Sequence, residues 1–399
     1  MATRRAEALL RKRRQPLRPT SWEIFFDLVY VFALTRMTQR LVEELTSERR
    51  VLRTEAGESL ILLLATYMVW LVTTLTTNLF DPQRPEIQLL AAAALLGALL
   101  MGVAIPQAFE QRSLLFAGSY VSIHLVQGLF FVPALRGHPV QRRALRMLVW
   151  SSISAVPWIA GALLGNGVRG VLWTLAIAVD YAGVAFGQPT PKLGRQPESE
   201  MSIDPEHLSE RFRLFFTIAL GELILALGAT YSRGDLSAGS TVAFVASFAT
   251  AALLWRIYIY RAGELLPAAI AGAREPAHLA GFTVPAHVLM LAGIIGISAG
   301  TELVIQHPFG STDPAWIVFM LGGPLVFLAG RSIFEYVVFS RVSPSRLFGM
   351  LALVALAPAM RVLPPLGTAV APALVLTAVA VADTMRAREH PNEPPAPPR

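Results

Sequence analysis

Acidic residues inside apolar segments are the first candidates for chemistry in this chain. Glu222 lies roughly ten residues into the apolar stretch 212–231, which at about 1.5 Å per helical residue is near the middle of a bilayer. A carboxyl group at that depth must be protonated, be paired, or face a polar cavity. We therefore predict either a carboxylate that carries a proton or cation, or a protonated glutamic acid bonded to a neighbouring helix.

A second acidic pair stands near the start of the chain. Glu23 and Asp27 are four residues apart and share one face of a predicted helix that follows Pro19, Thr20 and Ser21. Carboxylates in a first helical turn are stabilised by the helix dipole, which accounts for Glu23, whereas Asp27 is one turn deeper. Two interpretations stay open: an interfacial helix cap, or a functional or buried ion pair.

Basic side chains at comparable depth are candidate partners for these acids. Arg256 and Asp180 lie in the inner halves of their predicted spans, and Glu210 and Arg211 open the segment that holds Glu222. A cluster of Asp27, Asp180, Arg211 and Arg256 would balance its charges, either as a structural salt-bridge network or as part of a site. Further along, Arg331 and Glu335 are predicted to form an in-helix pair.

The elements that carry these residues are predicted to be membrane helices. Of the 399 residues, 54% are hydrophobic and 15% are charged, against about 25% charged in soluble domains. The apolar residues form blocks long enough to cross a bilayer. We predict an all-α, polytopic transmembrane helix bundle of about twelve spans, with the lipid bilayer as solvent. The spans are expected at 22–42, 59–79, 87–105, 114–135, 145–164, 168–187, 212–231, 240–260, 280–302, 315–339, 346–361 and 364–384.

The basic residues indicate how these spans are oriented. Most of the 34 Lys and Arg residues fall in segments that are cytoplasmic if the N-terminus is inside, which is the positive-inside pattern. Both termini are therefore predicted to be cytoplasmic. Because the basic clusters lie between apolar blocks, the net charge of +7 is interpreted as a topology signal and not as nucleic-acid binding. The basic N-terminus could resemble a signal peptide, but the charges in the apolar stretch favour a retained first helix.

The organisation of the chain follows from its polar breaks. We expect a basic cytoplasmic N-terminus at 1–20, a first six-span half at 21–187, a polar linker at 188–211, a second half at 212–385, and a disordered cytoplasmic tail at 386–399. Transporters are often built from repeated halves. A true internal repeat is left open, because the only signal is weak. Glu23, which is followed by two adjacent phenylalanines, loosely resembles Glu210, which is also followed by two adjacent phenylalanines.

No cofactor, metal or catalytic residue is predicted. There is no cysteine, the histidines show no metal-ligand spacing, and His124 and His287 within the spans are interpreted as hydrogen-bonded core residues and not haem ligands. A retinal Schiff base would need a buried lysine, and Lys12 and Lys192 lie outside the spans. Motifs typical of hydrolases and nucleotide-binding proteins are absent from the sequence, which makes an enzyme the less favoured class.

Three segments together resemble the bacterial low temperature requirement A (LtrA) family. They are SWEIFFDLVYVFALT from residue 21, HLSERFRLFFTIALGELILALG from 207 and ALLWRIYIYRAGE from 252. Arg256 and Arg261 depart from that pattern, standing where an aromatic and an acidic residue are usual. The resemblance implies a bacterial inner-membrane protein and leaves the reaction open. The family-like positions are Glu23, Phe25, Phe26, Asp27, Glu210, Arg211, Phe215, Gly221, Glu222, Trp255 and Tyr258.

The leading functional hypothesis is a secondary transporter or ion-coupled permease for an ion or small molecule. Its candidate binding or coupling residues are Glu23, Asp27, Asp180, Glu210, Arg211, Glu222 and Arg256. Two alternatives stay open: a membrane-embedded enzyme with a lipid-facing cleft, and a structural or stress-adaptation protein whose charges brace helix packing. The bracing alternative predicts that every buried carboxylate is paired. The sequence carries no prediction of oligomeric state.

Overall fold

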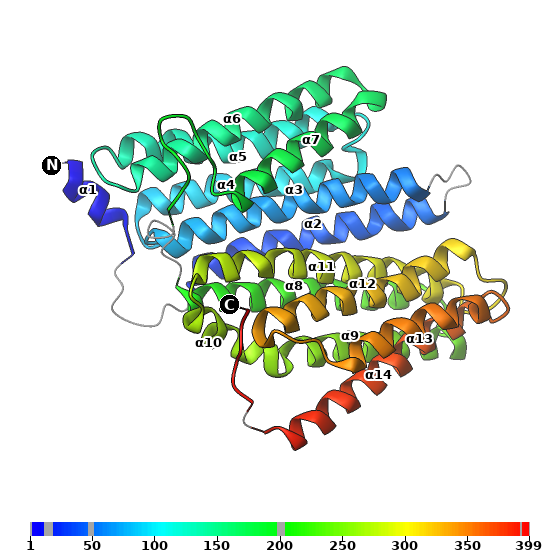
Figure 1. The fold of residues 1–399 in the computed structure, drawn as a ribbon. Coiled ribbons are helices and arrows are strands. Elements are labelled where there is room, and N and C mark those ends of the chain that lie inside the picture. Colours follow the sequence, from blue (N-terminus) through cyan, green and yellow to red (C-terminus); the bar gives the residue numbers. More distant parts are fainter. Residues whose placement is uncertain (1, 12–18, 47–51, 198–203, 392, 399) are drawn as a thin grey trace. The chain divides into compact units, whose positions relative to one another are not determined.

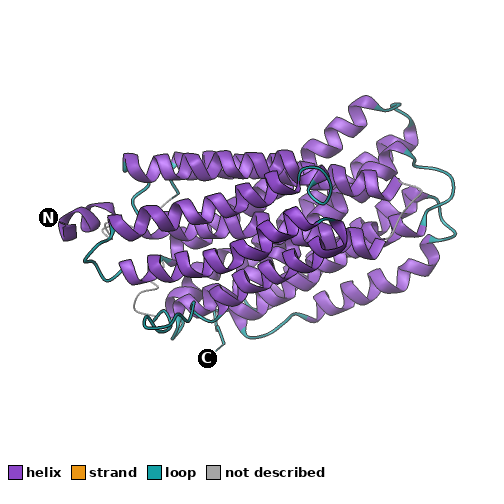
Figure 2. Ribbon diagram, turned by 90° about the horizontal axis from the view of Figure 1, so that it is seen from above, coloured by secondary structure: helices purple, strands orange, loops and turns teal. Residues whose placement is uncertain are grey.

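The computed structural model describes residues 2–11, 19–46, 52–197, 204–391 and 393–398. Within these residues the regular secondary structure is helical, apart from two isolated bridges (Figure 2). The chain divides into two compact units, one formed by Met1–Arg36 and Ala56–Arg211, the other by Met37–Glu55 and Phe212–Arg399. Helices α2 (Ser21–Thr46) and α8 (Pro205–Arg233) each pass from one unit into the other along the chain.

The remaining helices belong to one unit or almost wholly to one (Figure 1). The first unit holds α1 (Ala2–Leu9), α3 (Leu52–Leu79), α4 (Pro85–Ala104), α5 (Ser113–Ala134), α6 (Gln141–Leu164) and α7 (Asn166–Ala185). The second holds α9 (Ala238–Tyr258), α10 (Glu264–Gly272), α11 (Pro276–Gln306), α12 (Pro314–Phe339), α13 (Pro344–Met360) and α14 (Pro365–Glu389). The second unit also takes residues 37–55, unlike the predicted second half, and an internal repeat stays a prediction.

Each of the twelve predicted spans is a helix. In the described part of the chain, ten helices are long and apolar enough to cross a membrane. The other two are α2, which carries Glu23, Asp27 and Arg36 along its length, and α13, which has 17 residues. Large hydrophobic side chains such as Leu89, Val171 and Phe348 are mostly exposed on these helices, as lipid-facing positions require. This confirms the all-α, polytopic fold class.

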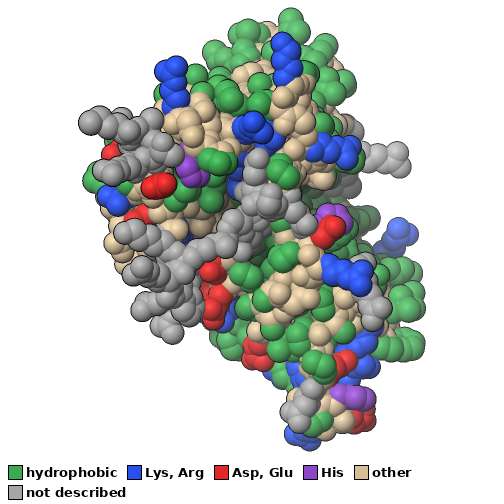
Figure 3. Space-filling view, turned by 60° about the vertical axis from the view of Figure 1, so that its left-hand side comes forward, with side chains coloured by type: hydrophobic (Ala, Val, Ile, Leu, Met, Phe, Trp, Pro, Cys, Tyr) green, Lys and Arg blue, Asp and Glu red, His purple; other side chains and the backbone are tan. Residues whose placement is uncertain are grey.

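Charged side chains of both signs are present on one face of the molecule. On the face shown in Figure 3 they lie among hydrophobic side chains, and hydrophobic side chains are most numerous at the top and at the right-hand edge. Charged groups remain in water at the ends of membrane helices, whereas apolar groups cover the sides that meet lipid.

A break after α9 was not predicted from the sequence. Between Ile259 and Gly263 the chain leaves helical geometry at Tyr260 (ψ 120°) and at Arg261, whose φ of 60° lies in the left-handed region. A Cβ atom added at Gly263 would lie 2.9 Å from the carbonyl oxygen of Tyr258, so a side chain there would clash with the break. The eighth predicted span therefore ends here and is followed by the short helix α10.

Helices α11 and α12 pack closely because glycines line their contact (Figure 1). A Cβ atom added at Gly293 would lie 2.6 Å from the carbonyl oxygen of Gly323, and one added at Gly330 would lie 2.6 Å from that of Ala286. Backbone atoms of the partner helix thus occupy the space that a side chain would need.

Helix α14 continues to Glu389, beyond its predicted end, and the described residues after it contact the second unit. The amide of Ala396 donates to the carbonyl oxygen of Val338 at 2.9 Å, and the Ser340 hydroxyl donates to the carbonyl oxygen of Ala396 at 2.6 Å. The segment that follows α14 therefore lies against the end of α12.

Candidate functional site: buried charges on α2 and α8

Helix α2 begins with a capping box that positions Glu23. The amide and hydroxyl groups of Thr20 donate to Oε2 of Glu23 at 2.7 and 2.9 Å, and the Glu23 amide lies 3.4 Å from the Thr20 hydroxyl. Reciprocal bonds between a threonine and a glutamate three residues later satisfy free donors of a first helical turn. The predicted cap is therefore present, and Oε1 of Glu23 is left to bind elsewhere.

Asp27 forms a two-pronged ion pair with Arg211 of α8. The guanidinium group donates to Oδ2 at 2.8 Å and to Oδ1 at 2.7 Å, and the side chains of both residues are at most 1% exposed. Trp70 of α3 donates from Nε1 to Oδ1 at 2.9 Å, and Arg211 also donates to the carbonyl oxygen of Glu23 at 2.7 Å. Such planar, charge-assisted pairs are strong and directional.

Glu23 pairs with His207, one turn before Arg211 on the same helix. Nε2 of His207 lies 2.7 Å from Oε1 of Glu23, and Nδ1 lies 2.9 Å from the side-chain nitrogen of Asn78. The Asn78 oxygen accepts from the Asp204 amide at 3.1 Å, so the Asn78 nitrogen must be the group that faces the ring. Nδ1 is then an acceptor, Nε2 carries the proton, and His207 donates to Glu23.

The two pairs form a matched ladder between α2 and α8. Glu23 and Asp27 are four residues apart on one helix, and His207 and Arg211 are four residues apart on the other. Residues at this spacing lie on one face of a helix, so two helices running side by side can join both pairs at once. His207 lies outside the predicted span 212–231 and was not among the candidate residues, although the equal spacing of the two pairs was a usable signal.

The charges of the ladder are nearly balanced, and both of its carboxylates are hydrogen-bonded. Arg11, 9% exposed, adds a guanidinium nitrogen 3.7 Å from Oε2 of Glu23, so each acid has a cation beside it. A buried charge that is fully paired holds its helices in one arrangement. The geometry of Glu23, Asp27 and Arg211 is therefore that of a brace in the first unit.

Two residues of the predicted four-member cluster have other contacts. Asp180 accepts from the Tyr120 hydroxyl at 2.7 Å and from Nε1 of Trp158 at 3.4 Å. Arg256 lies in the second unit, where its guanidinium group stacks 3.6 Å from the Tyr260 ring and donates to the Thr384 hydroxyl at 3.3 Å. Of the four, the structure shows an ion pair only between Asp27 and Arg211, since a tyrosine and a tryptophan satisfy Asp180.

The predicted in-helix pair of Arg331 and Glu335 is wrong. Arg331 donates instead to the carbonyl oxygens of Ile257 at 2.8 Å and Tyr260 at 3.1 Å, which the break after α9 leaves available. Glu335 accepts from Arg341 at 3.1 Å and from the Ser343 hydroxyl. Free backbone carbonyls in a membrane helix need donors, and they compete with the pair that spacing alone suggests.

The intramembrane histidine His287 is a hydrogen-bonded core residue, as expected. Its Nδ1 atom lies 2.8 Å from the carbonyl oxygen of Thr283, and its Nε2 atom lies 3.0 Å from the Tyr258 hydroxyl. The carbonyl can only accept, so Nδ1 carries the proton and Nε2 accepts from tyrosine. Both ring nitrogens are thereby occupied by protein groups.

Glu222 stands apart from the ladder in its surroundings. It lies on α8 within the second unit, it is 1% exposed, and neither carboxyl oxygen has a hydrogen-bond partner among the described residues. The hydroxyl groups of Thr38 on α2 and Ser298 on α11 face the carboxyl group, but within the described ranges they too have no partner in normal hydrogen-bond geometry. Glu210, at the start of the same helix, is partly buried. The surroundings of Glu222 therefore differ from those of the paired acids.

These features define the class of the protein: a polytopic α-helical membrane protein whose interior holds paired acids and one acid, Glu222, without a partner among the described residues. The chain belongs to the family of bacterial low temperature requirement A proteins (LtrA), whose family model matches residues 18–381. It is 32% identical over 338 residues to an uncharacterized protein of Rhizobium meliloti (strain 1021), a match that covers 84% of this chain and 81% of the relative. No solved structure matches.

Proposed function

We propose that this protein is an ion-coupled transporter in which the Glu222 carboxyl group takes up and releases a proton or a small cation. One observation carries the proposal. Glu222 is 1% exposed and unpaired in the described part of the chain, whereas Glu23 and Asp27, equally buried, are fully paired.

The physical argument rests on the energy of an unpaired buried carboxyl group. Keeping a polar group in an apolar interior without a hydrogen bond costs about 1–3 kcal/mol by protein mutational data, and a charge costs more. A structural role would favour a fixed partner, as Asp27 has in Arg211. A carboxyl group without one is suited to a partner that comes and goes, such as a proton or a cation.

The neighbouring hydroxyl groups fit this role. Thr38 and Ser298, both 1% exposed, present oxygen atoms toward Glu222 from two different helices. Hydroxyl oxygens can accept from a protonated carboxyl group or join a carboxylate around a small cation. Because all three groups are enclosed in this conformation, transport requires a second conformation that opens Glu222 to water.

The proposed location is the bacterial cytoplasmic membrane, with both termini in the cytoplasm. The excess of Lys and Arg on one set of connecting segments supports this orientation. An even number of spans, with α2 and α13 counted among them, puts the two termini on the same side.

The proposal predicts that Glu222→Gln abolishes ion flux. The purified protein is reconstituted into liposomes with an entrapped pH indicator, and gradients of protons, Na⁺ or K⁺ are imposed in turn. Wild-type protein is expected to exchange protons or a cation across the membrane. Glu222→Gln should insert and fold normally but show no flux above empty liposomes, since an amide neither ionises nor carries a proton at neutral pH.

The matched control is Glu206→Gln, which removes an exposed carboxylate from the first turn of the same helix. Its flux should equal that of the wild type. Equal flux through wild type and Glu222→Gln, or no wild-type flux under any of the gradients, would contradict the proposal.

Bracing by the paired charges is a second candidate role, and the ladder on α2 and α8 favours it for the first unit. That role alone requires every buried carboxylate to have a partner, which Glu222 lacks among the described residues. We therefore propose bracing by the ladder as a support for transport and not as the whole function.

A further inference from the structure

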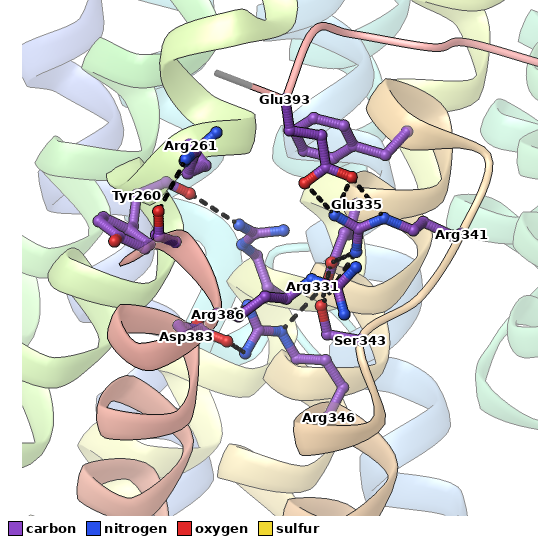
Figure 4. A pocket seen from close by; sticks show the side chains of 12 residues that line it. Tyr260, Arg261, Arg331, Glu335, Arg341, Ser343, Arg346, Asp383, Arg386 and Glu393 are labelled. Atoms are coloured by element: carbon purple, nitrogen blue, oxygen red, sulfur yellow. Dashed lines mark hydrogen bonds and ion pairs between the residues drawn. The ribbon is translucent and has the colours of Figure 1, made fainter. Parts of the chain in front are cut away.

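A pocket in the second unit is rich in arginine. It lies where the end of α12, the start of α13, the end of α14 and the break after α9 come together (Figure 4). Five arginines and three acids line it, so its formal charge is 5 − 3 = +2. We call it the arginine pocket; its charged residues are Arg261, Arg331, Arg341, Arg346, Arg386, Glu335, Asp383 and Glu393.

Arg331 lines the arginine pocket, and one of its three nitrogens is available to bind a ligand. Two of its nitrogens donate to backbone carbonyl oxygens of the broken helix, and its side chain is buried. The third, Nη1, is buried and has no hydrogen-bond partner in the part of the chain that the structure describes. A guanidinium group fixed at two donors presents the remaining one in a defined direction, which suits an oxygen-bearing anion.

The two acids on the helices do not neutralise the arginine pocket. Asp383 is bound by Arg346 at 2.7 and 2.8 Å, and Glu335 is bound by Arg341 and Ser343. These pairs leave the charges of Arg331, Arg386 and Arg261 without an acid in a salt bridge among the described residues. A positive field therefore remains inside the pocket.

The third acid reaches the arginine pocket from the segment after α14. Two nitrogens of Arg341 donate to Oε1 of Glu393 at 2.9 and 2.6 Å (Figure 4). Partial burial raises the pKa of the Glu393 carboxyl, but the hydrogen bonds and charge of Arg341 outweigh it and hold that pKa below its usual value. The carboxylate is thus ionised at neutral pH and is a quarter exposed.

We propose that the arginine pocket is a binding site for a phosphate-bearing anion, and that Glu393 occupies the anion's place when none is bound. Without Glu393 the formal charge of the lining is 5 − 2 = +3, which complements a dianionic phosphate. The cavity volume is about 40 Å³ with the Glu393 carboxylate in place, so a phosphate group would enter by displacing that carboxylate. Free phosphate and the headgroup of an anionic lipid share this chemistry.

The segment after α14 is also bonded to the end of α12 at a point beyond Glu393. Ala396 is bonded to Val338 and Ser340, so the segment that carries Glu393 is tethered beside the arginine pocket. A tethered group competes at high effective concentration yet can be displaced without leaving the protein. An anion that binds the pocket would release Glu393 and leave Arg341 to bind the anion.

The test measures phosphate binding by the full-length protein in detergent, by isothermal titration calorimetry with inorganic phosphate as the probe. Glu393→Gln should bind phosphate about tenfold tighter than the wild type, the ratio expected if Glu393 fills the pocket about nine-tenths of the time. Adding Arg341→Gln to that variant should weaken binding about tenfold or more, because a charged two-pronged donor is lost.

The matched control is Glu389→Gln, which removes the same charge from an exposed position at the end of α14, outside the pocket. Its affinity for phosphate should equal that of the wild type. A second arm compares nanodiscs of phosphatidylcholine with and without phosphatidic acid, and measures retained lipid by native mass spectrometry.

The outcomes answer two questions: whether the site exists, and whether its anion is soluble or belongs to a lipid headgroup. Tighter phosphate binding by Glu393→Gln supports a soluble anion, and selective retention of phosphatidic acid by that variant supports a lipid headgroup. The proposal is overturned if Glu393→Gln holds neither probe more tightly than Glu389→Gln does. Because binding is measured without transport, the result is independent of the role of Glu222.

Discussion

Arg211→Ala is expected to lower the free energy of unfolding by about 3–5 kcal/mol, the cost of leaving one member of a buried ion pair alone. Asp27 would keep the Trp70 bond but lose both guanidinium donors, and it has no exposure to water through which to be solvated. The carbonyl oxygen of Glu23 would lose its Arg211 donor as well. Thermal unfolding followed by tryptophan fluorescence in detergent measures the effect.

Two further variants make this test specific to the pair. Arg213→Ala removes an exposed arginine two residues away and should change stability little, since surface charges contribute about 0–1 kcal/mol. The double variant Asp27→Asn with Arg211→Gln removes both charges and should recover much of the stability that Arg211→Ala loses. If Arg211→Ala were as stable as Arg213→Ala, the ladder would not be a brace.

Gly330→Ala is expected to be the second strongly destabilising change, although it adds a single methyl group. The new carbon would lie 2.6 Å from the carbonyl oxygen of Ala286 and 2.9 Å from the amide nitrogen of Met290, both backbone atoms of α11. Backbone cannot move aside as a flexible side chain can, so the two helices must separate. Overpacking of this kind costs about 1–3 kcal/mol and occasionally more.

The same helix supplies the control for this prediction. A Cβ atom at Gly322 of α12 would meet nothing within 4 Å. Gly322→Ala should therefore be neutral, or stabilising by up to about 1 kcal/mol through the higher helix propensity of alanine. Thermal unfolding should show a loss of stability for Gly330→Ala and no loss for Gly322→Ala, and equal losses would show that α11 and α12 do not make this close backbone contact.

The transport and anion-site proposals place different demands on the second unit. Glu222 needs a conformational change to reach water, whereas the arginine pocket already opens to solvent beside the tail. The close contact of α11 and α12 leaves little room for movement between these two helices. A change that opens Glu222, whose neighbour Ser298 is on α11, is therefore expected to move α11 and α12 together.

The sequence by itself determined the class of the protein and the position of its helices. Hydropathy and helical length are local properties, because a run of about twenty mostly apolar residues can cross a bilayer as a helix with its backbone groups bonded within the segment. All twelve predicted spans are helices, and the family resemblance on three short segments is confirmed. The spacing of Glu23 and Asp27 also indicated correctly that they share a face.

Only the tertiary structure decided which charges pair. The sequence grouped Asp27 with Asp180, Arg211 and Arg256, yet Asp180 binds Tyr120, Arg256 stacks on Tyr260, and Arg331 binds carbonyls of a break that hydropathy could not reveal. The reason is physical: depth along a helix follows from the sequence, whereas the rotation and neighbours of that helix depend on packing against all the others. Pairing requires both, which is why Asp27, which has a partner, and Glu222, which has none among the residues described, look alike until the helices are assembled.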